Sequence, residues 1–265
     1  AGEFVDIDDV YEAIGAVACG SKTFEELVDM TNHAITTPGV CAGLGTANSM
    51  HIVAEGLGMA LPGNALVPAT MRDLTEYSRK AGKQVVRLAK AGITPSMIMT
   101  KEAFRNAIVV HSAIGGSTNA LIHLPAIAKE LGIELDPELF NEINRKIPHI
   151  GNVNPSGKHL TESFWFAGGI PMVQIMLKDH LDLDVLTVTG KTLGENLEEI
   201  QRDGFFERNI GYLHNYGLER EDVITPVETT KEMGSIAVLK GNLAPEGAVV
   251  KYSACEESMR KHQGK

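Results

Sequence analysis

One cysteine in a glycine-rich stretch is the residue whose surroundings are best suited to chemistry. Cys41 lies in the stretch 39–45, which contains three glycines, and Thr46 and Asn48 follow it at the start of an apolar segment. Glycine allows turns at positive φ and the close approach of a ligand, while threonine and asparagine cap helices. A thiol near a helix N-terminus is shifted toward the thiolate by the helix dipole. Such a thiolate is able to ligate a metal or attack a carbonyl, and the simpler interpretation is a small buried side chain.

A second glycine turn carries hydroxyl and amide side chains at the start of another predicted helix. It runs from Gly115 and Gly116 through Ser117, Thr118 and Asn119. Free backbone N–H groups, the helix dipole and side-chain donors together make an anion-binding device. Helix capping with close packing explains the same residues equally well, so the sequence leaves both interpretations open.

A third turn, Asn-Pro-Ser-Gly-Lys at 154–158, contains Ser156 and ends on a cation. Lys158 is a flexible ammonium on a glycine-bearing turn, suited to a carboxylate, a phosphate or an acidic neighbour. A solvated surface lysine is the plain alternative and is at least as common. Ser156 and Lys158 are therefore candidates for a binding site.

The segment 184–192 looks like a phosphate loop because a strand-like run leads into Gly190, Lys191 and Thr192. A nucleotide-binding phosphate loop needs a glycine five positions before Gly190, and position 185 is valine. The nucleotide-binding interpretation therefore fails. What remains is a predicted strand that turns into a helix.

Seven motifs resemble, in order, signatures of the dihydroxy-acid and sugar-acid dehydratases, a family that includes phosphogluconate dehydratases. They are Gly-Val-Cys-Ala-Gly-Leu-Gly-Thr-Ala-Asn-Ser-Met (39–50), Glu-Gly-Leu-Gly-Met-Ala-Leu-Pro-Gly (55–63), Ile-Gly-Gly-Ser-Thr-Asn-Ala (114–120), Asn-Pro-Ser-Gly-Lys (154–158), Ala-Gly-Gly-Ile-Pro (167–171), Leu-Thr-Val-Thr-Gly-Lys-Thr-Leu (186–193) and Gly-Asn-Leu-Ala-Pro-Glu-Gly (241–247). The motifs cover nearly the whole chain. The resemblance implies the central part of the family's N-terminal domain and the start of its C-terminal domain.

The resemblance implies a hydro-lyase that acts on a small anionic hydroxy acid, in amino-acid biosynthesis or sugar-acid catabolism. Family members remove water from a 2,3-dihydroxy acid and give a 2-keto acid after tautomerisation. An iron–sulfur cluster (2Fe-2S or 4Fe-4S) acts on the departing C3 hydroxyl, Mg²⁺ orients the carboxylate, and a serine of the C-terminal domain removes the C2 proton. This division of labour is chemically sound, because hydroxide leaves poorly until a metal takes up its charge and the proton needs an oriented base.

The family motif identifies Cys41 as one of three cluster ligands, and hence as a cofactor-binding and metal-binding residue. The resemblance extends to residues expected around the cluster or the substrate. These are Thr46, Asn48, Ser117, Thr118, Asn119, Ser156 and Lys158.

The sequence also departs from the family pattern. The two other cluster cysteines and the adjoining Asp-Lys magnesium site have no counterpart before Cys41, and Cys19 and Cys255 match no ligand motif. The catalytic serine and a metal-binding glutamate of the C-terminal domain are likewise missing, so the catalytic residues of this chain are unknown. Because iron–sulfur clusters are held by several thiolates, we expect an incomplete chain that is inactive alone and holds neither cofactor.

Two other functions fit the same residues. A metal-free small-anion binding module, or a subunit completed by a partner chain, would keep the glycine turns without the missing ligands. Nucleophilic catalysis by Cys41 is the third hypothesis, but it lacks an identifiable base close in sequence, where His33 and His51 are no more than candidates.

Composition restricts the class of protein. The 265 residues carry a net charge of −10 with no basic block to offset it, which disfavours nucleic acid and anionic membrane surfaces as partners. No apolar run reaches the length of a membrane span, and the N-terminus shows no signal-peptide pattern. Three widely spaced cysteines are no disulfide framework, so we expect a cytoplasmic protein.

The pattern of segments predicts an α/β fold, with a helix-rich layered domain and a mainly parallel sheet. We place this domain at 1–232. The segment 233–265 would begin a β-rich domain, with strands at 236–239 and 248–251. Apolar surface left exposed by the incomplete domain favours a homodimer or higher oligomer.

Overall fold

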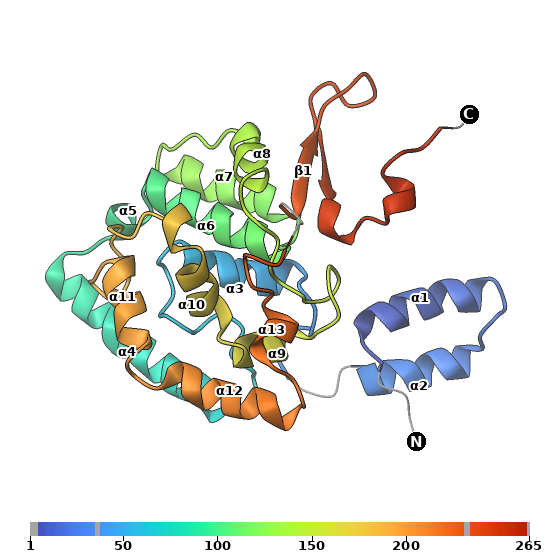
Figure 1. Cartoon of the computed structure of the whole chain (residues 1–265), viewed down its shortest axis with the longest axis horizontal. Coiled ribbons are helices and arrows are strands. Elements are labelled where there is room, and N and C mark those ends of the chain that lie inside the picture. Colours follow the sequence, from blue (N-terminus) through green and yellow to red (C-terminus); the bar gives the residue numbers. More distant parts are fainter. Residues whose placement is uncertain (1–4, 35–37, 231–233, 264–265) are drawn as a thin grey trace.

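The computed structural model describes residues 5–34, 38–230 and 234–263. Most of these residues form α-helices, and two short strands follow near the C-terminus (Figure 1). The α-helices are α1 (Ile7–Ala18), α2 (Phe24–Ala34), α3 (Thr46–Gly56), α4 (Arg72–Ala91), α5 (Pro95–Ile98), α6 (Lys101–Ile114), α7 (Ala120–Glu130), α8 (Pro137–Asn144), α9 (Thr161–Phe166), α10 (Gly169–Met176), α11 (Leu193–Ile200), α12 (Phe205–Asn215) and α13 (Arg220–Val223). The strands are β1 (Ile236–Leu239) and β2 (Ala248–Lys251), and the 3-10 helices are η1 (Lys178–His180), η2 (Tyr252–Ala254) and η3 (Glu257–Met259). This order confirms the predicted helix-rich domain followed by strands.

Helix α6 lies at the centre of the core, and α3, α8 and α10 pack around it (Figure 1). Every residue from Asn106 to Ile114 is buried, as expected for a mainly apolar helix at the centre of a core. Helix α3 approaches α6 so closely that a Cβ at Gly56 would lie 3.1 Å from Cα of Ala107. The start of α3 lies beside the end of α6, which brings the Cys41 loop and the Gly115 turn to one end of the core.

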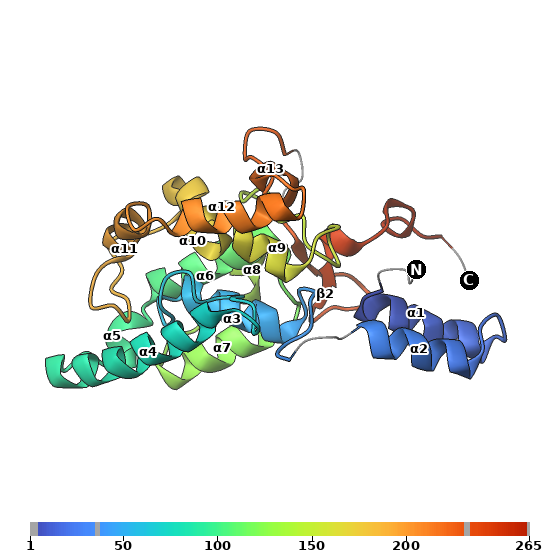
Figure 2. The ribbon, with the colours of Figure 1, turned by 90° about the horizontal axis from the view of Figure 1, so that it is seen from below.

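The α1–α2 hairpin stands beside the main body of helices in both views (Figures 1 and 2). One tie to the body is the hydrogen bond that Asn154 Nδ2 donates to Asp6 Oδ2, at 2.7 Å. Tyr11, Ile14 and Phe24 on the hairpin are exposed. Exposed apolar groups of this kind favour association, and the oligomeric state stays a prediction.

The strands form one two-stranded antiparallel sheet within the described residues, with Ile236 opposite Lys251 and Leu239 opposite Ala248. Both strands have the predicted bounds. The parallel sheet expected among the helices does not occur in the described part of the chain. The predicted boundary near residue 232 falls on 231–233, outside the described residues, so the division into 1–232 and 233–265 stays a prediction.

Helix α4 spans 20 residues and carries most of its cations on its solvent-exposed surface. None of its residues is buried. No helix within the described ranges combines the length and the hydrophobicity needed to cross a bilayer.

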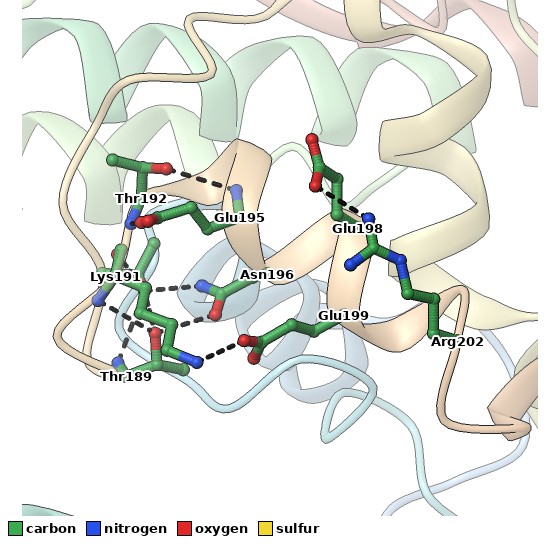
Figure 3. Close-up of polar contacts among 9 residues, drawn as sticks. Thr189, Lys191, Thr192, Glu195, Asn196, Glu198, Glu199 and Arg202 are labelled. Carbon is green, nitrogen blue, oxygen red and sulfur yellow. Dashed lines mark hydrogen bonds and ion pairs between the residues drawn. The ribbon is translucent and has the colours of Figure 1, made fainter.

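The segment that resembles a phosphate loop is a turn fastened to α11 (Figure 3). Asn196 Nδ2 donates to Thr187 Oγ1 at 2.7 Å, and Thr189 Oγ1 donates to Asn196 Oδ1 at 2.8 Å. Lys191 forms an ion pair with Glu199, so its ammonium is not free to bind a phosphate in this turn. Side-chain bonds of this kind compete with a strand ladder, which explains why the predicted strand is reduced to a single bridge between Leu186 and Thr192.

Asn196→Ala is expected to lower the free energy of unfolding by about 2 kcal/mol, because two hydroxyls lose a partner in a buried place. Asn196 is 4% exposed. Urea denaturation followed by circular dichroism measures the change, with Asn215→Ala, at an exposed position on α12, as the control. Equal midpoints for the two variants would contradict the role given to Asn196.

Candidate functional site

A buried amide side chain, that of Asn48, holds the Cys41 loop in place. Asn48, in the first turns of α3, donates from Nδ2 to the Cys41 carbonyl at 2.6 Å and to the Gly43 carbonyl at 2.7 Å. The Asn48 side chain is 1% exposed. Leu44 N donates to the carbonyl of Asn154 at 2.7 Å, which fixes the loop from its other side. Asn48 therefore shapes the loop, and its role beside a cluster or substrate stays a prediction.

The Cys41 thiol is free and half-buried at this loop. A Cβ at Gly45, the N-cap of α3, would lie 3.9 Å from the sulfur, so the thiol sits close to the N-terminus of the helix. The simpler interpretation, a fully buried cysteine, does not apply.

The donor set around Cys41 is too small for a metal centre. Across residues 5–34, 38–230 and 234–263, no three His, Cys, Asp or Glu side chains are grouped so that they could hold a metal ion. Cys19 follows the end of α1 and Cys255 follows η2. Because a cluster needs several thiolates, the described residues do not fit a complete iron–sulfur site.

A buried histidine shapes the second glycine turn. Helix α6 ends at Ile114 and is capped by Gly115, whose φ of 72° lies in the left-handed region that favours glycine. His111 is fully buried, and its Nε2 lies 2.9 Å from the carbonyl of Ser117, so Nε2 carries the proton and donates it. Burial lowers the pKa of His111 to about 4, so the ring is neutral at physiological pH.

His111 is not among the site residues expected from the sequence. Its signal is positional: a histidine in the last turn of an apolar helix, directly before two glycines. A Cβ at Gly116 would overlap the His111 ring, being 3.0 Å from Cγ and closer still to Cδ2 and Nε2. Position 116 therefore requires glycine, because any side chain there would collide with the His111 ring.

The structure brings the first two turns together. Asn119 Nδ2 donates to Thr46 Oγ1 at 2.6 Å, and Thr46 Oγ1 lies 3.4 Å from Ser117 Oγ. Ser117 N donates to the hydroxyl of Ser49 at 2.8 Å, a contact that no motif of the sequence indicates. Thr118 is half-buried in the same turn. Three of the predicted residues, Thr46, Ser117 and Asn119, thus share one hydrogen-bond network.

The backbone N–H groups of this turn are largely occupied. Gly116 N donates to the carbonyl of His111 at 3.2 Å, and Ser117 N donates to Ser49. Asn119 N donates to Ser117 Oγ at 3.3 Å. The turn does not offer the row of free donors that the anion-binding interpretation requires, so its geometry favours capping and close packing.

The two candidate residues of the third turn differ in exposure: Ser156 is half-buried and Lys158 is exposed. Ser156 Oγ lies 2.7 Å from Ser253 Oγ, and a Cβ at Gly115 would lie 2.9 Å from Ser156 Oγ. Ser156 therefore adjoins the second glycine turn. Lys158 is exposed, and within the described residues its ammonium makes no hydrogen bond or ion pair.

The chain is similar to known proteins over nearly its whole length. Residues 1–196 match the family model described as dihydroxy-acid/6-phosphogluconate dehydratase N-terminal, and residues 222–265 match the corresponding C-terminal model. The chain is 43% identical over 266 residues to a dihydroxy-acid dehydratase of Halothermothrix orenii and 40% identical over 265 residues to one of Methanothermobacter thermautotrophicus. Each alignment takes in 99% of this chain and 45% of the relative, so the chain spans less than half the length of these relatives. The chain belongs to the dihydroxy-acid/6-phosphogluconate dehydratase family.

Proposed function

We propose that this chain is part of a dehydratase that removes water from a 2,3-dihydroxy acid or sugar acid and yields a 2-keto acid. The observation that carries the proposal is the meeting of two family motifs at the start of α3, where Asn119 Nδ2 lies 2.6 Å from Thr46 Oγ1. The Cys41 thiol lies in the loop directly before that helix. A thiol, hydroxyls and amides held together on rigid helices suit the binding of a small polar substrate.

We assign Cys41 as one ligand of the iron–sulfur cluster. Its half-buried sulfur and its loop, fastened by Asn48, support this role. The described residues supply no complete cluster or magnesium site, so the remaining ligands would come from further polypeptide. Until those ligands are added, we expect the chain to be inactive alone. The three free cysteines support a reducing cytoplasmic location as part of the proposal.

The test compares Cys41→Ser with Cys255→Ser in the polypeptide that contains this sequence, purified without oxygen. Iron, acid-labile sulfide and formation of 2-keto acid from 2,3-dihydroxy-3-methylbutanoate and from 6-phosphogluconate are measured. Cys41→Ser is expected to lose iron and at least about 10³-fold in kcat, as for loss of a metal ligand, while Cys255→Ser keeps both.

Full activity of Cys41→Ser would contradict the ligand assignment. Activity of the 265-residue chain by itself would contradict its expected dependence on further polypeptide. Saturable binding of the acids without iron or turnover, in the longer polypeptide, would favour the alternative of a metal-free small-anion binding module. Recovery of iron only after a second chain is added would favour the subunit completed by a partner.

A further inference from the structure

Helix α4 borders a groove whose two halves differ in chemistry. One half is an apolar cavity of about 460 Å³, lined mainly by aliphatic side chains of α4, of the segment after α3 and of the segment around α5. The other half is a polar cavity of about 470 Å³ between α4, α11 and α12. Leu61 and Gln84 line both cavities, so the two adjoin each other beside α4.

The helical period of α4 assigns its side chains to the two cavities by type. Val85 and Leu88 line the apolar cavity, whereas Lys80, Lys83 and Arg87 line the polar one. Residues three or four positions apart lie on one face of a helix, so the three cations form a row. Val85 is 60% exposed, and no residue of α4 is buried. The described part of the chain therefore leaves this apolar face open.

Gln84 marks the boundary between the two cavities. Its Nε2 donates to the carbonyl of Val188 at 2.9 Å, which ties α4 to the turn before α11. Val188 lines the apolar cavity, and the next residue, Thr189, lines the polar one. The lining therefore changes from apolar to polar at the same point on both walls of the groove.

The four carboxylates that line the polar cavity are compensated within the protein. Glu76 forms an ion pair inside α4, and Glu199 forms one with Lys191 (Figure 3). Asp73 and Asp203 lie at the N-terminal ends of α4 and α12, where the helix dipole favours a negative charge. The negative charge of the lining is thus already balanced without the cations of α4 beside Gln84.

The cations beside Gln84 have no such partners. Within the described residues, Lys83 and Arg87 make no hydrogen bond or ion pair. Lys80, one turn earlier, has its Nζ 5.6 Å from the centroid of the Tyr77 ring. Positive charge is therefore available where the polar cavity meets the apolar one.

We propose that this groove binds an aliphatic carboxylate, with its chain in the apolar cavity and its carboxylate at Lys83 and Arg87. A cavity of this size, mostly apolar and with a few polar groups at one end, is typical of a small-molecule site. Lysine and arginine give a carboxylate charge-assisted hydrogen bonds, which are stronger than those between neutral groups. The groove lies past the C-terminal end of α3, whereas Cys41 precedes its N-terminal end, so this inference does not rest on the dehydratase proposal.

The test is calorimetric titration of the 265-residue chain at pH 7 with decanoate, octanoate and decan-1-ol. Each buried methylene is worth about fourfold in affinity, so decanoate should bind roughly 15-fold more tightly than octanoate. Decan-1-ol has the same chain without the charge, so it should bind more weakly than decanoate. Equal affinity for octanoate and decanoate would overturn the proposal.

Two matched pairs of variants on α4 locate the ligand. Lys83→Met should weaken decanoate binding about threefold, the effect of one exposed ion pair, and should not change the affinity for decan-1-ol. Lys90→Met, outside both linings, should bind as the wild type does. Val85→Gln should weaken binding at least about fourfold through lost apolar contact, while Val86→Gln, which lines neither cavity, should not. All four positions are exposed, so the fold should tolerate these changes.

Methyl NMR of the unmodified chain gives an independent measurement. Decanoate should shift the methyl signals of Val85 and Leu88 and leave those of Val86 in place. Equal shifts at the two valines, or equal losses of affinity in the two glutamine variants, would show unspecific binding and overturn the proposal.

The same titration on the longer polypeptide that contains this sequence separates a ligand site from a surface covered by protein. Decanoate should bind there with the same dependence on Lys83. If it no longer binds, polypeptide fills the groove and the proposal is wrong. None of these measurements requires turnover or iron, so failure of the dehydratase proposal and failure of this site are separately visible.

Discussion

Gly116→Ala is expected to lower the free energy of unfolding by about 3 kcal/mol or more and to disorganise the turn that carries Ser117. The new Cβ would overlap the imidazole of His111. The ring is fully buried and holds the Ser117 carbonyl at 2.9 Å, so it is unable to shift without breaking that bond. Overpacking costs about 1–3 kcal/mol, and an unsatisfied buried group adds about 1–3 kcal/mol. Urea denaturation measures the sum.

Gly82→Ala on α4 is the matched control, because nothing lies within 4 Å of a Cβ at that position. There the exchange should be neutral or stabilise the chain by up to about 1 kcal/mol, as alanine is the better helix former. If the His111 ring is the obstacle, combining Gly116→Ala with His111→Ala should cost less than the sum of the two single changes. Additive losses would show that the obstacle lies elsewhere.

Local patterns of the sequence were enough to predict many of the helices and both strands. The strands at 236–239 and 248–251 have their predicted bounds, because β-branched runs between turn signals specify short strands without distant information. Helix α8 begins at Pro137 after the capping Asp136, as this residue pair predicts. The parallel sheet was a different kind of prediction, since a strand needs a partner. The run after Asp184 instead satisfies its polar groups through Asn196.

In the candidate site, contacts within one motif were predictable from the sequence, and contacts between distant segments were not. Cys41 and Asn48 are only seven residues apart and lie in one motif, so a local pattern was able to indicate their relation. The contacts of Ser49 with Ser117 and of Ser156 with Ser253 join segments 68 and 97 residues apart. Such pairs follow from the packing of α3 against α6 and from the placement of the strands, and no local pattern encodes either.

The other large effect concerns Glu55, a buried carboxyl at the end of α3. It is 4% exposed, and its two oxygens accept hydrogen bonds from Gly63 N and Ala65 N, both at 2.7 Å. Burial raises its pKa from 4.5 to about 7, and the backbone donors oppose the shift without cancelling it. The protonated form is therefore favoured in the folded chain.

Stability is expected to fall by about 3 kcal/mol, from this group alone, as the pH rises from 4.5 to 7. Below the unfolded pKa, both states hold the proton and the contribution to stability is fully present. Between the two pKa values, the unfolded chain has released the proton that the folded chain keeps. Above about 7 both states are ionised, and the contribution is lost.

Glu55→Gln removes the titrating group, so the difference in stability between wild type and variant should shrink as the pH rises through this window. Glutamine offers one acceptor oxygen instead of two, and at low pH the variant should be less stable by about 1–3 kcal/mol. Urea denaturation at intervals from pH 4 to pH 8 measures both effects.

The exposed Glu195 provides a control of opposite sign. Hydrogen bonds from Thr192 lower its pKa, so its contribution is present above its ordinary pKa and is lost as the pH falls. Glu195→Gln should therefore change the pH dependence in the reverse direction from Glu55→Gln. If Glu55→Gln leaves the slope between pH 4.5 and 7 unaltered, the backbone donors outweigh burial and Glu55 is an ionised anchor of the Gly63 turn. Since Glu55 ends the helix that begins beside Cys41, either result decides which protonation state holds α3 in place.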